Sequence, residues 1–372
     1  MHASNDAMIR VMLLCTDLQR GGLPLRLARL APLLREHGIQ PIVGCLAPAG
    51  PLSVELTQGG IETFSCDART RFDLSCLLRL SGHIRAFNPD LIHASLFHAN
   101  LAARLVGRLD RQRPIITSTV TIEVERPSHR WLESLTAPMS DVHVANSEAV
   151  ARHLVGDLGF PPEKVVTILN GIDIAAVAKA QPIDRKREGV PPDVKLVVWA
   201  GRMDPVKDLG TLLNAFARAR DNVNACLVLL GDGPERSRVE SRIARLKLQH
   251  EVRLAGWRED TLSWFKAADA FLFTSLTEGS PNALIEAMAC GCPVIASDLP
   301  SIRELIEKAQ GWTLVSPRNI DEFASKLRKT LESGRKHEAN QSAASFLQTY
   351  DTGKIAMAWA RLYHQLAAGS HN

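Results

Sequence analysis

Residues 277–294 read Thr277-Glu-Gly-Ser-Pro-Asn-Ala-Leu-Ile-Glu286-Ala-Met-Ala-Cys-Gly-Cys-Pro-Val294 and contain, in order, an acidic loop, the start of a helix and a buried strand. Ser280 is a residue type that caps helix N-termini, and Pro281 suits the first helical position, where its missing N–H is not needed. The stretch therefore predicts a helix over 281–289 and a strand over 294–296.

The start of this helix predicts an anion site. Asn282, Ala283 and Leu284 would present backbone N–H groups without intrahelical acceptors at the positive end of the helix dipole, which suits phosphate. Glu286 lies one turn after Asn282 on the same face, and Glu278 lies on the loop before the helix. A phosphate site between two carboxylates suits a diphosphate with hydroxyl-rich sugars at both ends, which is the shape of a nucleotide sugar.

Strand-like and helix-like segments alternate along the chain, which is typical of parallel sheets covered by helices on both faces. The predicted strands are Ile9–Cys15, Gln40–Leu46, Ile61–Ser65, Leu91–Ala94, Ile115–Thr119, Val142–Ala145, Val165–Leu169, Leu196–Ala200, Ala225–Leu230, Val252–Ala255, Ala270–Thr274 and Val294–Ala296. Because 372 residues exceed the usual single core, two domains are expected. We predict an α/β protein with two Rossmann-like, doubly wound domains facing a cleft, and with ligand-binding residues on loops that follow strands.

The domain boundary is predicted near residue 180. The strand and helix pattern breaks at Asn170–Asp173, and the segment Ala180–Asp193 is polar and contains three prolines, which is typical of a linker or an exposed entry. The predicted domains are therefore residues 1–180 and 181–349.

Composition excludes several classes of protein. A net charge of +4 is too small to indicate nucleic-acid binding. The seven cysteines, several in apolar runs, are predicted to be buried thiols in a reducing compartment. Cys290 and Cys292 lack a second Cys/His pair nearby, and the chain has no Asp-x-Asp pair, so no metal is predicted. The run Val11–Cys15 is too short for a signal sequence, and no stretch approaches the roughly 20 apolar residues that span a bilayer. A cytoplasmic location is expected, with peripheral contact to the inner face of the membrane left open.

Two strand-following loops carry candidate phosphate ligands. Arg202 can bind two phosphate oxygens through its guanidinium, and Lys207 adds a compact charge. The alternative for this loop is a solvated basic turn. Gly21 and Gly22 take the corresponding position after the first strand of the chain. A glycine pair there either lets a phosphate approach the backbone or forms an ordinary flexible turn.

The region after the fourth strand holds two histidines and an arginine cluster. His98 is a candidate to bind a sugar hydroxyl or stabilise developing charge, with His93 a weaker one, although a lone histidine at a strand end is more often structural. The arginines form either a solvated helix face or a patch for anionic lipid headgroups. They are Arg104, Arg108, Arg111 and Arg113.

Several segments, in this order over essentially the whole chain, together resemble the retaining glycosyltransferases of family 4. They are Ser147–Ala149, Asn170–Asp173, Gly201–Leu209, Leu229–Arg236, Ala268–Ser275 and Glu278–Glu286. The resemblance implies a GT-B fold with an acceptor-binding first domain, a nucleotide-sugar-binding second domain and a last helix, within residues 350–372, that crosses back to the first.

The resemblance also implies an activity. A sugar moves from a nucleotide sugar to a glycan or lipid-linked acceptor with retained anomeric configuration and without metal or cofactor. UDP-sugar is the expected donor, with GDP- and ADP-sugars as alternatives, and cell-surface polysaccharide or lipopolysaccharide assembly is the expected pathway.

The same resemblance implies roles for residues. Arg202 and Lys207 bind the donor diphosphate, Glu286 the ribose and Glu278 the transferred sugar, while Gly22 closes over the donor phosphate. The implied catalytic set is Glu278, Arg202, Lys207 and His98. The implied donor-binding set is Gly21, Gly22, Arg202, Lys207, Glu278, Ser280, Asn282, Ala283, Leu284 and Glu286.

One departure from the family keeps alternatives open. Many members have a histidine after the fifth strand, where this chain has Thr121, so His98 or Glu123 is expected to take its role. The competing functions are a sugar-nucleotide epimerase of similar fold, a sugar-binding protein and a non-catalytic scaffold.

Overall fold

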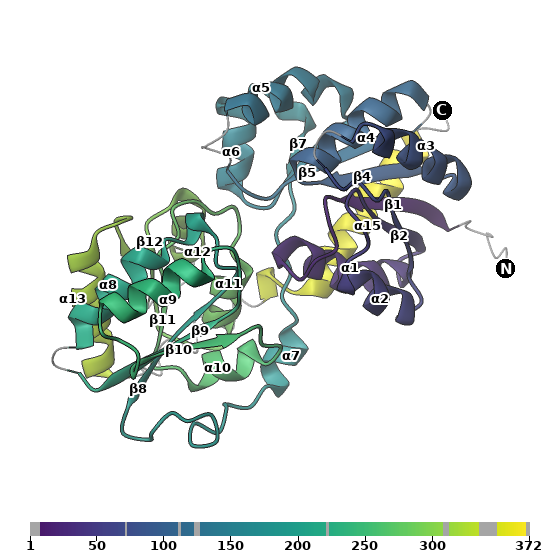
Figure 1. Ribbon diagram of the computed structural model, residues 1–372. Helices are drawn as coiled ribbons and strands as arrows, with labels where there is room; N and C mark the ends of the chain where they lie inside the picture. The colour runs from purple at the N-terminus through teal and green to yellow at the C-terminus, as the bar shows by residue number, and fades with distance from the viewer. Residues whose placement is uncertain are drawn as a thin grey trace. The chain divides into compact units, whose positions relative to one another are not determined.

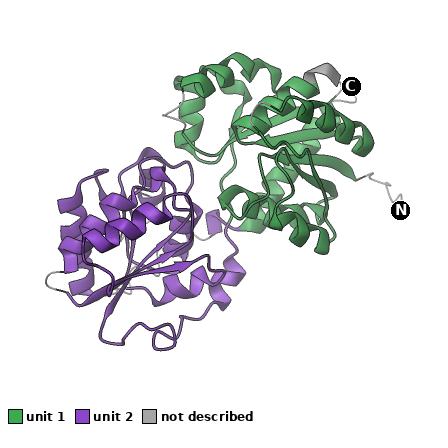
Figure 2. Ribbon diagram, viewed as in Figure 1, with its two compact units in different colours: residues 1–171, 352–372 green, residues 172–351 purple. Residues whose placement is uncertain are grey.

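The computed structural model describes residues 8–70, 73–110, 113–122, 127–220, 223–307, 312–334 and 348–369. The chain forms two compact units, residues 1–171 with 352–372 and residues 172–351 (Figure 2). The chain passes from the first unit to the second within the predicted break at 170–173. Residues 172–180, which the sequence pattern assigned to the first domain, therefore belong to the second unit.

The first unit contains a seven-stranded parallel sheet with the order β3-β2-β1-β4-β5-β6-β7 (Figure 1). Its strands are β1 (Ile9–Cys15), β2 (Ile39–Cys45), β3 (Glu62–Ser65), β4 (Leu91–Ser95), β5 (Ile115–Thr119), β6 (Val142–Ala145) and β7 (Val165–Thr167). From Val11 to Cys15, β1 is a continuous apolar run because both of its faces are buried, whereas β4 also buries His93 and Ser95. The helices are α1 (Gly22–Arg35), α2 (Pro51–Gln58), α3 (Ser75–Phe87), α4 (Phe97–Asp110), α5 (Pro127–Thr136) and α6 (Glu148–Gly156), with 3-10 turns η1 (Ala137–Met139) and η2 (Pro162–Lys164).

The last helix of the chain, α15 (Thr352–Gly369), packs in the core of the first unit. Trp359 and Tyr363 are buried, and the Trp359 ring stacks on His93 of β4 with 4.4 Å between ring centroids. The helix contacts α1 and β1 as well, so the C-terminal segment completes the core of the N-terminal unit.

The second unit contains a six-stranded parallel sheet with the order β10-β9-β8-β11-β12-β13. Its strands are β8 (Lys195–Ala200), β9 (Ala225–Leu230), β10 (Val252–Gly256), β11 (Ala270–Phe273), β12 (Val294–Ser297) and β13 (Thr313–Val315). Its helices are α7 (Ile174–Lys179), α8 (Leu209–Ala219), α9 (Arg236–Arg245), α10 (Thr261–Ala267), α11 (Asn282–Ala289), α12 (Pro300–Glu307) and α13 (Ile320–Ser333), with the 3-10 turn η3 (Pro205–Lys207). In α8, Leu212, Leu213 and Phe216 recur at helical spacing and are buried.

The first six strands of the seven-stranded sheet follow the same order as the six strands of the second sheet, so each sheet has one point where the order reverses. This switch point lies between β1 and β4 in the first unit and between β8 and β11 in the second. Open parallel sheets bind ligands beyond the carboxyl ends of their strands at this point, because the two adjacent loops run apart there. The loops after β8 and β11 are therefore the first place to look for a ligand site in the second unit.

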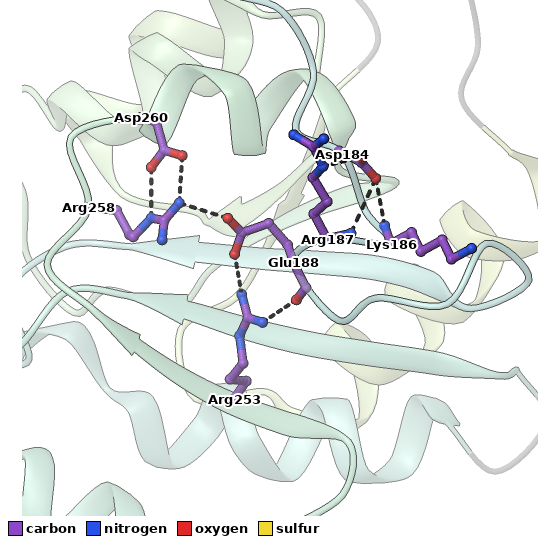
Figure 3. A network of polar contacts seen from close by, with 7 residues as sticks. All are labelled: Asp184, Lys186, Arg187, Glu188, Arg253, Arg258 and Asp260. Atoms are coloured by element: carbon purple, nitrogen blue, oxygen red, sulfur yellow. Dashed lines mark hydrogen bonds and ion pairs between the residues drawn. The ribbon is translucent and has the colours of Figure 1, made fainter.

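The segment predicted to be a linker is fixed to the second unit. The Glu188 carboxylate forms ion pairs with Arg253 at 3.2 Å and Arg258 at 3.0 Å, and its carbonyl accepts a further bond from Arg253 (Figure 3). Arg258 also binds Asp260 through two hydrogen bonds, which raises the pKa of this guanidinium above its ordinary value. Asp184 accepts hydrogen bonds from two backbone amides of the following turn. Glu188 thus pairs this segment with β10 and the loop that follows it.

Most of the cysteines are buried as composition predicted, and Cys76 and Cys226 are partly exposed. All seven cysteines are free, and five of them are buried. In the part of the chain that the structure describes, no helix combines the length and apolarity needed to cross a bilayer. No three potential ligands among His, Cys, Asp and Glu come together within the described residues in a way that could hold a metal.

Candidate active site

The loop after β8 is held in shape by the neighbouring loop after β9. Gly231 has a φ of +141°, and a Cβ there would lie 1.9 Å from the Gly201 carbonyl oxygen, so only glycine allows this approach. The Met203 amide donates to the Asp232 carbonyl at 2.9 Å, and its carbonyl accepts from Glu235 at 2.9 Å. The chain then forms η3, which ends at Lys207.

Asp208 connects η3 to α8 in a left-handed conformation, with a φ of +43°. Its carboxylate accepts hydrogen bonds from the amide and hydroxyl of Thr211, at 3.2 and 2.6 Å, and so caps α8. This cap fixes where the helix begins and therefore where Lys207 lies at the end of the loop.

The loop after β11 lies against the loop after β8. The Leu276 amide donates to the Val206 carbonyl at 2.8 Å. As a result, the Lys207 Nζ lies 2.5 Å from Glu278 Oε1, although 71 residues separate the two in sequence. The Nζ also lies 5.7 Å from the centre of the Phe273 ring. The structure thus brings together the two residues that the family resemblance assigned to the donor diphosphate and the donor sugar.

The ion pair between Lys207 and Glu278 is mostly removed from solvent. The two side chains are 20% and 10% exposed. Charges buried to this degree attract one another more strongly than charges in water, and removing either one leaves the other without a counter-charge. The pair lies at the switch point of the second sheet, between the loops after β8 and β11. A charged pair in this position can bind and orient a polar ligand.

The start of α11 corrects one prediction. The helix begins at Asn282, and its N-cap is Pro281, whose ψ of 105° is extended, so Ser280 lies one residue too early to cap the helix. The first intrahelical bond runs from the Ile285 amide to the Pro281 carbonyl at 3.1 Å. Ser280 is buried.

The predicted anion site still lies at the start of α11, although the helix begins one residue later than predicted. The amides of Asn282, Ala283 and Leu284 belong to the first turn of α11, where helix geometry provides no intrahelical acceptor. The Asn282 and Glu286 side chains are partly exposed and lie one turn apart. Their roles toward a donor stay predictions.

Arg202 differs from Lys207 in its environment. Its side chain is 63% exposed and pairs with Asp204, two residues later, at 3.4 Å. An exposed pair of this kind contributes little to stability. Arg202 therefore lies on the loop that the sequence predicted, with a guanidinium that can exchange its carboxylate partner for a phosphate at small cost.

Gly21 and Gly22 lie at the start of α1 in the first unit. Gly21 is the N-cap, with an extended φ of −164°, and no side chain caps the helix. A Cβ at Gly21 would meet only the ring of Pro24 at 3.8 Å, which is ordinary contact. The fold of the first unit therefore does not require glycine at residue 21, which favours a role in ligand approach over a purely conformational one. This role stays a prediction.

The histidines of the first unit have different environments. His98 is exposed at the start of α4, with its ring 5.6 Å from that of His129. His93 is buried, and its ring nitrogens bind Tyr363 and Ser118 at 2.7 Å each. Because its ring is buried and bonded on both nitrogens, His93 has a structural role. The predicted role of His98 toward a sugar hydroxyl or a developing charge stays a prediction. Thr121 is exposed, and Glu123 lies outside the described residues.

Two of the four arginines that were candidates for a solvated face or a lipid patch have partners within the first unit. Arg104 is 1% exposed and donates to Ser140, Thr136 and Thr117 while it pairs with Glu133. Burying a guanidinium without partners would cost much free energy. Polar groups of α5 and β5, together with Ser140 at the end of η1, therefore surround the Arg104 guanidinium. Arg113 donates to the Pro89 carbonyl and the Asn88 side chain. The side chain of Arg108 and the whole of Arg111 lie outside the described residues.

We expect the buried His93 to make the stability of the protein depend on pH. Burial, with a smaller effect of Arg26, lowers the pKa of His93 from 6.5 to about 3. A lowered histidine pKa means that the unfolded state binds the proton first, so stability is complete above pH 6.5 and is lost as pH falls toward 3. Between pH 7.5 and 5, this loss is ~2 kcal/mol for one histidine.

Urea unfolding of the wild type and of His93→Gln at both pH values measures this effect. The variant is expected to lose ~2 kcal/mol less than the wild type between pH 7.5 and 5. The exposed His250→Gln variant should keep the pH dependence of the wild type. An equal loss in His93→Gln and the wild type would show that His93 is not the group responsible.

Comparison with known proteins agrees with the two-unit fold. Residues 20–176 match the family described as Glycosyltransferase Family 4, and residues 194–333 match the family described as Glycosyl transferases group 1. The crystal structure of Anabaena HepE in complex with UDP and glucose has a TM-score of 0.83 and 23% identity, over 96% of this chain and all of that one. This similarity confirms the predicted GT-B fold.

Two curated relatives illustrate the range of similar proteins. A Campylobacter jejuni enzyme named N-acetylgalactosamine-N,N'-diacetylbacillosaminyl-diphospho-undecaprenol 4-alpha-N-acetylgalactosaminyltransferase is 28% identical over 61% of this chain and 61% of its own length. The Bacillus anthracis N-acetyl-alpha-D-glucosaminyl L-malate synthase is 23% identical over 94% of this chain and 89% of its own length. The alignment therefore spans less than two thirds of the first relative and most of the second.

Proposed function

Because the chain belongs to the group 1, family 4 glycosyltransferases, we propose that it transfers a sugar from a nucleotide-sugar donor to a glycan or lipid-linked acceptor. The observation that carries the proposal is the ion pair of Lys207 with Glu278 at the switch point of the second sheet. We propose a UDP-sugar as donor, with GDP- and ADP-sugars as alternatives. HepE, which has the same fold, was crystallised with UDP and glucose.

The acceptor and the pathway are proposed from the relatives. The Campylobacter enzyme is named for a diphospho-undecaprenol acceptor, and another relative from Rhizobium meliloti is named for lipopolysaccharide core biosynthesis. We therefore propose an acceptor of cell-surface glycan assembly. Peripheral contact with an anionic membrane stays part of this proposal, but Arg104 cannot contribute to it because it is buried.

The proposed chemistry is electrostatic. As the bond between the anomeric carbon and the phosphate oxygen breaks, the sugar becomes oxocarbenium-like and the diphosphate gains charge. Lys207, Arg202 and the first amides of α11 would stabilise that charge. The departing phosphate would take the proton of the acceptor hydroxyl on the same face, so that the anomeric configuration is retained. Glu278 would orient the sugar hydroxyls for this attack.

The same groups support transfer without a divalent metal. Two cationic side chains and a helix N-terminus can together neutralise a diphosphate leaving group. The chain also contains no Asp-x-Asp pair of the kind that clamps a divalent ion. Transfer is therefore expected to continue in excess EDTA.

A donor panel tests the proposal. The purified protein is incubated with UDP-, GDP- and ADP-sugars in EDTA, first without an acceptor for slow hydrolysis and then with glycan and lipid-linked acceptors. Product NMR should show a sugar with the anomeric configuration of the donor. A donor whose ring stereochemistry changes without any acceptor would instead identify an epimerase.

Calorimetry separates the enzyme from a binding protein. A nucleoside diphosphate should bind with a 1:1 stoichiometry at the site of Lys207. Binding without hydrolysis or transfer for any donor and acceptor pair would favour the non-catalytic scaffold, for which Thr121 in place of the family histidine is the motivating observation.

A further inference from the structure

Two buried hydroxyl groups hold the main chain of the Lys207–Glu278 pair. Thr274 follows β11 directly, and its hydroxyl shares its proton between the carbonyls of Lys207 and Asp208, at 3.1 Å each. Ser301, in the first turn of α12, donates to the Glu278 carbonyl at 2.8 Å. Thr274 is 0% exposed and Ser301 is 1% exposed. Each charged residue is therefore held through its own carbonyl by a hydroxyl from another element.

These carbonyls belong to irregular backbone. Lys207 ends a 3-10 turn, so its carbonyl does not continue a helix or a strand ladder, whereas the Asp208 carbonyl also accepts from the Leu212 amide at 3.3 Å at the start of α8. Glu278 lies in the loop between β11 and α11. A buried carbonyl without a donor costs about 1–3 kcal/mol, so a donor from a neighbouring element selects the loop conformation that reaches it.

The side chains of the ion pair depend on this backbone. The Nζ of Lys207 lies 2.5 Å from Glu278 Oε1, so a shift of either main chain must be taken up by the two side chains or lengthens this contact. The bond between the Leu276 amide and the Val206 carbonyl joins the two loops at one point, but it lies before Lys207 in one loop and before Glu278 in the other. The two hydroxyls act at the charged residues themselves.

We propose that Thr274 and Ser301 are positioning residues of the donor site, with Thr274 setting the place of Lys207 and Ser301 that of Glu278. The proposal rests on the function proposed above. Neither side chain touches the donor in this scheme. Because Lys207 is assigned to the diphosphate and Glu278 to the sugar, losing the two hydroxyls should affect different steps.

Three variants test the proposal. Thr274→Val keeps the shape of the side chain and removes its hydroxyl. It should weaken UDP binding about tenfold and lower kcat as well, since misplacing a binding group by even 1 Å can cost up to about 10²-fold. Ser301→Ala should leave UDP affinity within twofold of the wild type and lower kcat about tenfold, because Glu278 acts on the sugar. Thr274→Ser keeps a hydroxyl and should restore most of the UDP affinity.

A matched control comes from the next strand. Ser297, the last residue of β12, is 0% exposed, and its hydroxyl has no hydrogen-bond partner among the described residues. Ser297→Ala removes a buried hydroxyl without removing an anchor, so kcat, KM and UDP affinity should stay within twofold of the wild type. The melting temperatures of all variants show whether a loss of activity or affinity results from a less stable fold.

The outcomes separate this proposal from the function on which it depends. Three results would overturn the positioning roles while leaving transferase activity in place. Thr274→Val and Ser301→Ala could change UDP affinity equally, or neither could have an effect. The third result is that Thr274→Ser fails to recover UDP affinity. If the wild type transfers no sugar, the proposed function fails, and UDP calorimetry still tests the role of Thr274. A wild type that binds no UDP, GDP or ADP would overturn both.

Discussion

Turnover should fall about 10²–10³-fold when Lys207 is replaced by methionine, which keeps the aliphatic stem and removes the charge. Lys207 is the less exposed of the two cations on the loop after β8, and it faces Glu278 directly. Without it, the diphosphate loses a cation aimed at its developing charge. The Glu278 side chain, 10% exposed, also loses its counter-charge and would repel the phosphate.

The reciprocal change should have the opposite effect on nucleotide binding. In the ligand-free protein, Glu278 neutralises Lys207, so Glu278→Gln should free the lysine and tighten UDP binding while it lowers kcat. Steady-state kinetics with the best donor and calorimetry with UDP measure both effects. Lys329→Met, at an exposed position of α13, is the matched control. Turnover of Lys207→Met within threefold of the wild type would remove Lys207 from the mechanism.

The second large effect is on stability. Arg104→Leu should lower the free energy of unfolding by about 3–5 kcal/mol, because it leaves the largely buried Glu133 carboxylate without its counter-charge. Arg85→Leu makes the same chemical change at an exposed position of α3 and should alter stability by less than about 0.5 kcal/mol. Urea unfolding of each variant gives the values.

A double variant distinguishes the loss of a pair from the loss of packing. Replacing Arg104 and Glu133 together by leucine removes both charges, and it should recover part of the stability lost in Arg104→Leu. If Arg104→Leu alone costs less than about 1 kcal/mol, the buried network is not what stabilises the contact of α4 with α5 and η1.

Local patterns predicted five of the six strands of the second unit and missed β13, which has only three residues. The bounds of β9 are those expected from the sequence, since β9 is a continuous apolar run. The start of α11 was expected one residue early. Serine and proline both favour helix starts, and the ψ of Pro281, which decides between them, depends on how the preceding loop is held.

The arginine cluster shows where sequence patterns fail. Arginines that recur along a helix are usually exposed to solvent. On that ground, the sequence predicted that Arg104 lies at the surface. Asn100 and Arg104 lie one turn apart and are both 1% exposed, so they share the inward face of α4. The polar partners that make this burial tolerable come from α5, η1 and β5, which local spacing does not reveal.

The amino-acid sequence by itself determined the alternation of strands and helices, the two loops that carry Lys207 and Glu278, and the residue types suited to a diphosphate. These are local properties, because side-chain periodicity and turn chemistry act over a few residues. Only the tertiary structure decided that Lys207 meets Glu278, that Thr274 and Ser301 hold their carbonyls, and that Arg104 is buried. Such contacts join residues far apart in the chain, and they depend on the strand order that places the ends of β8 and β11 side by side.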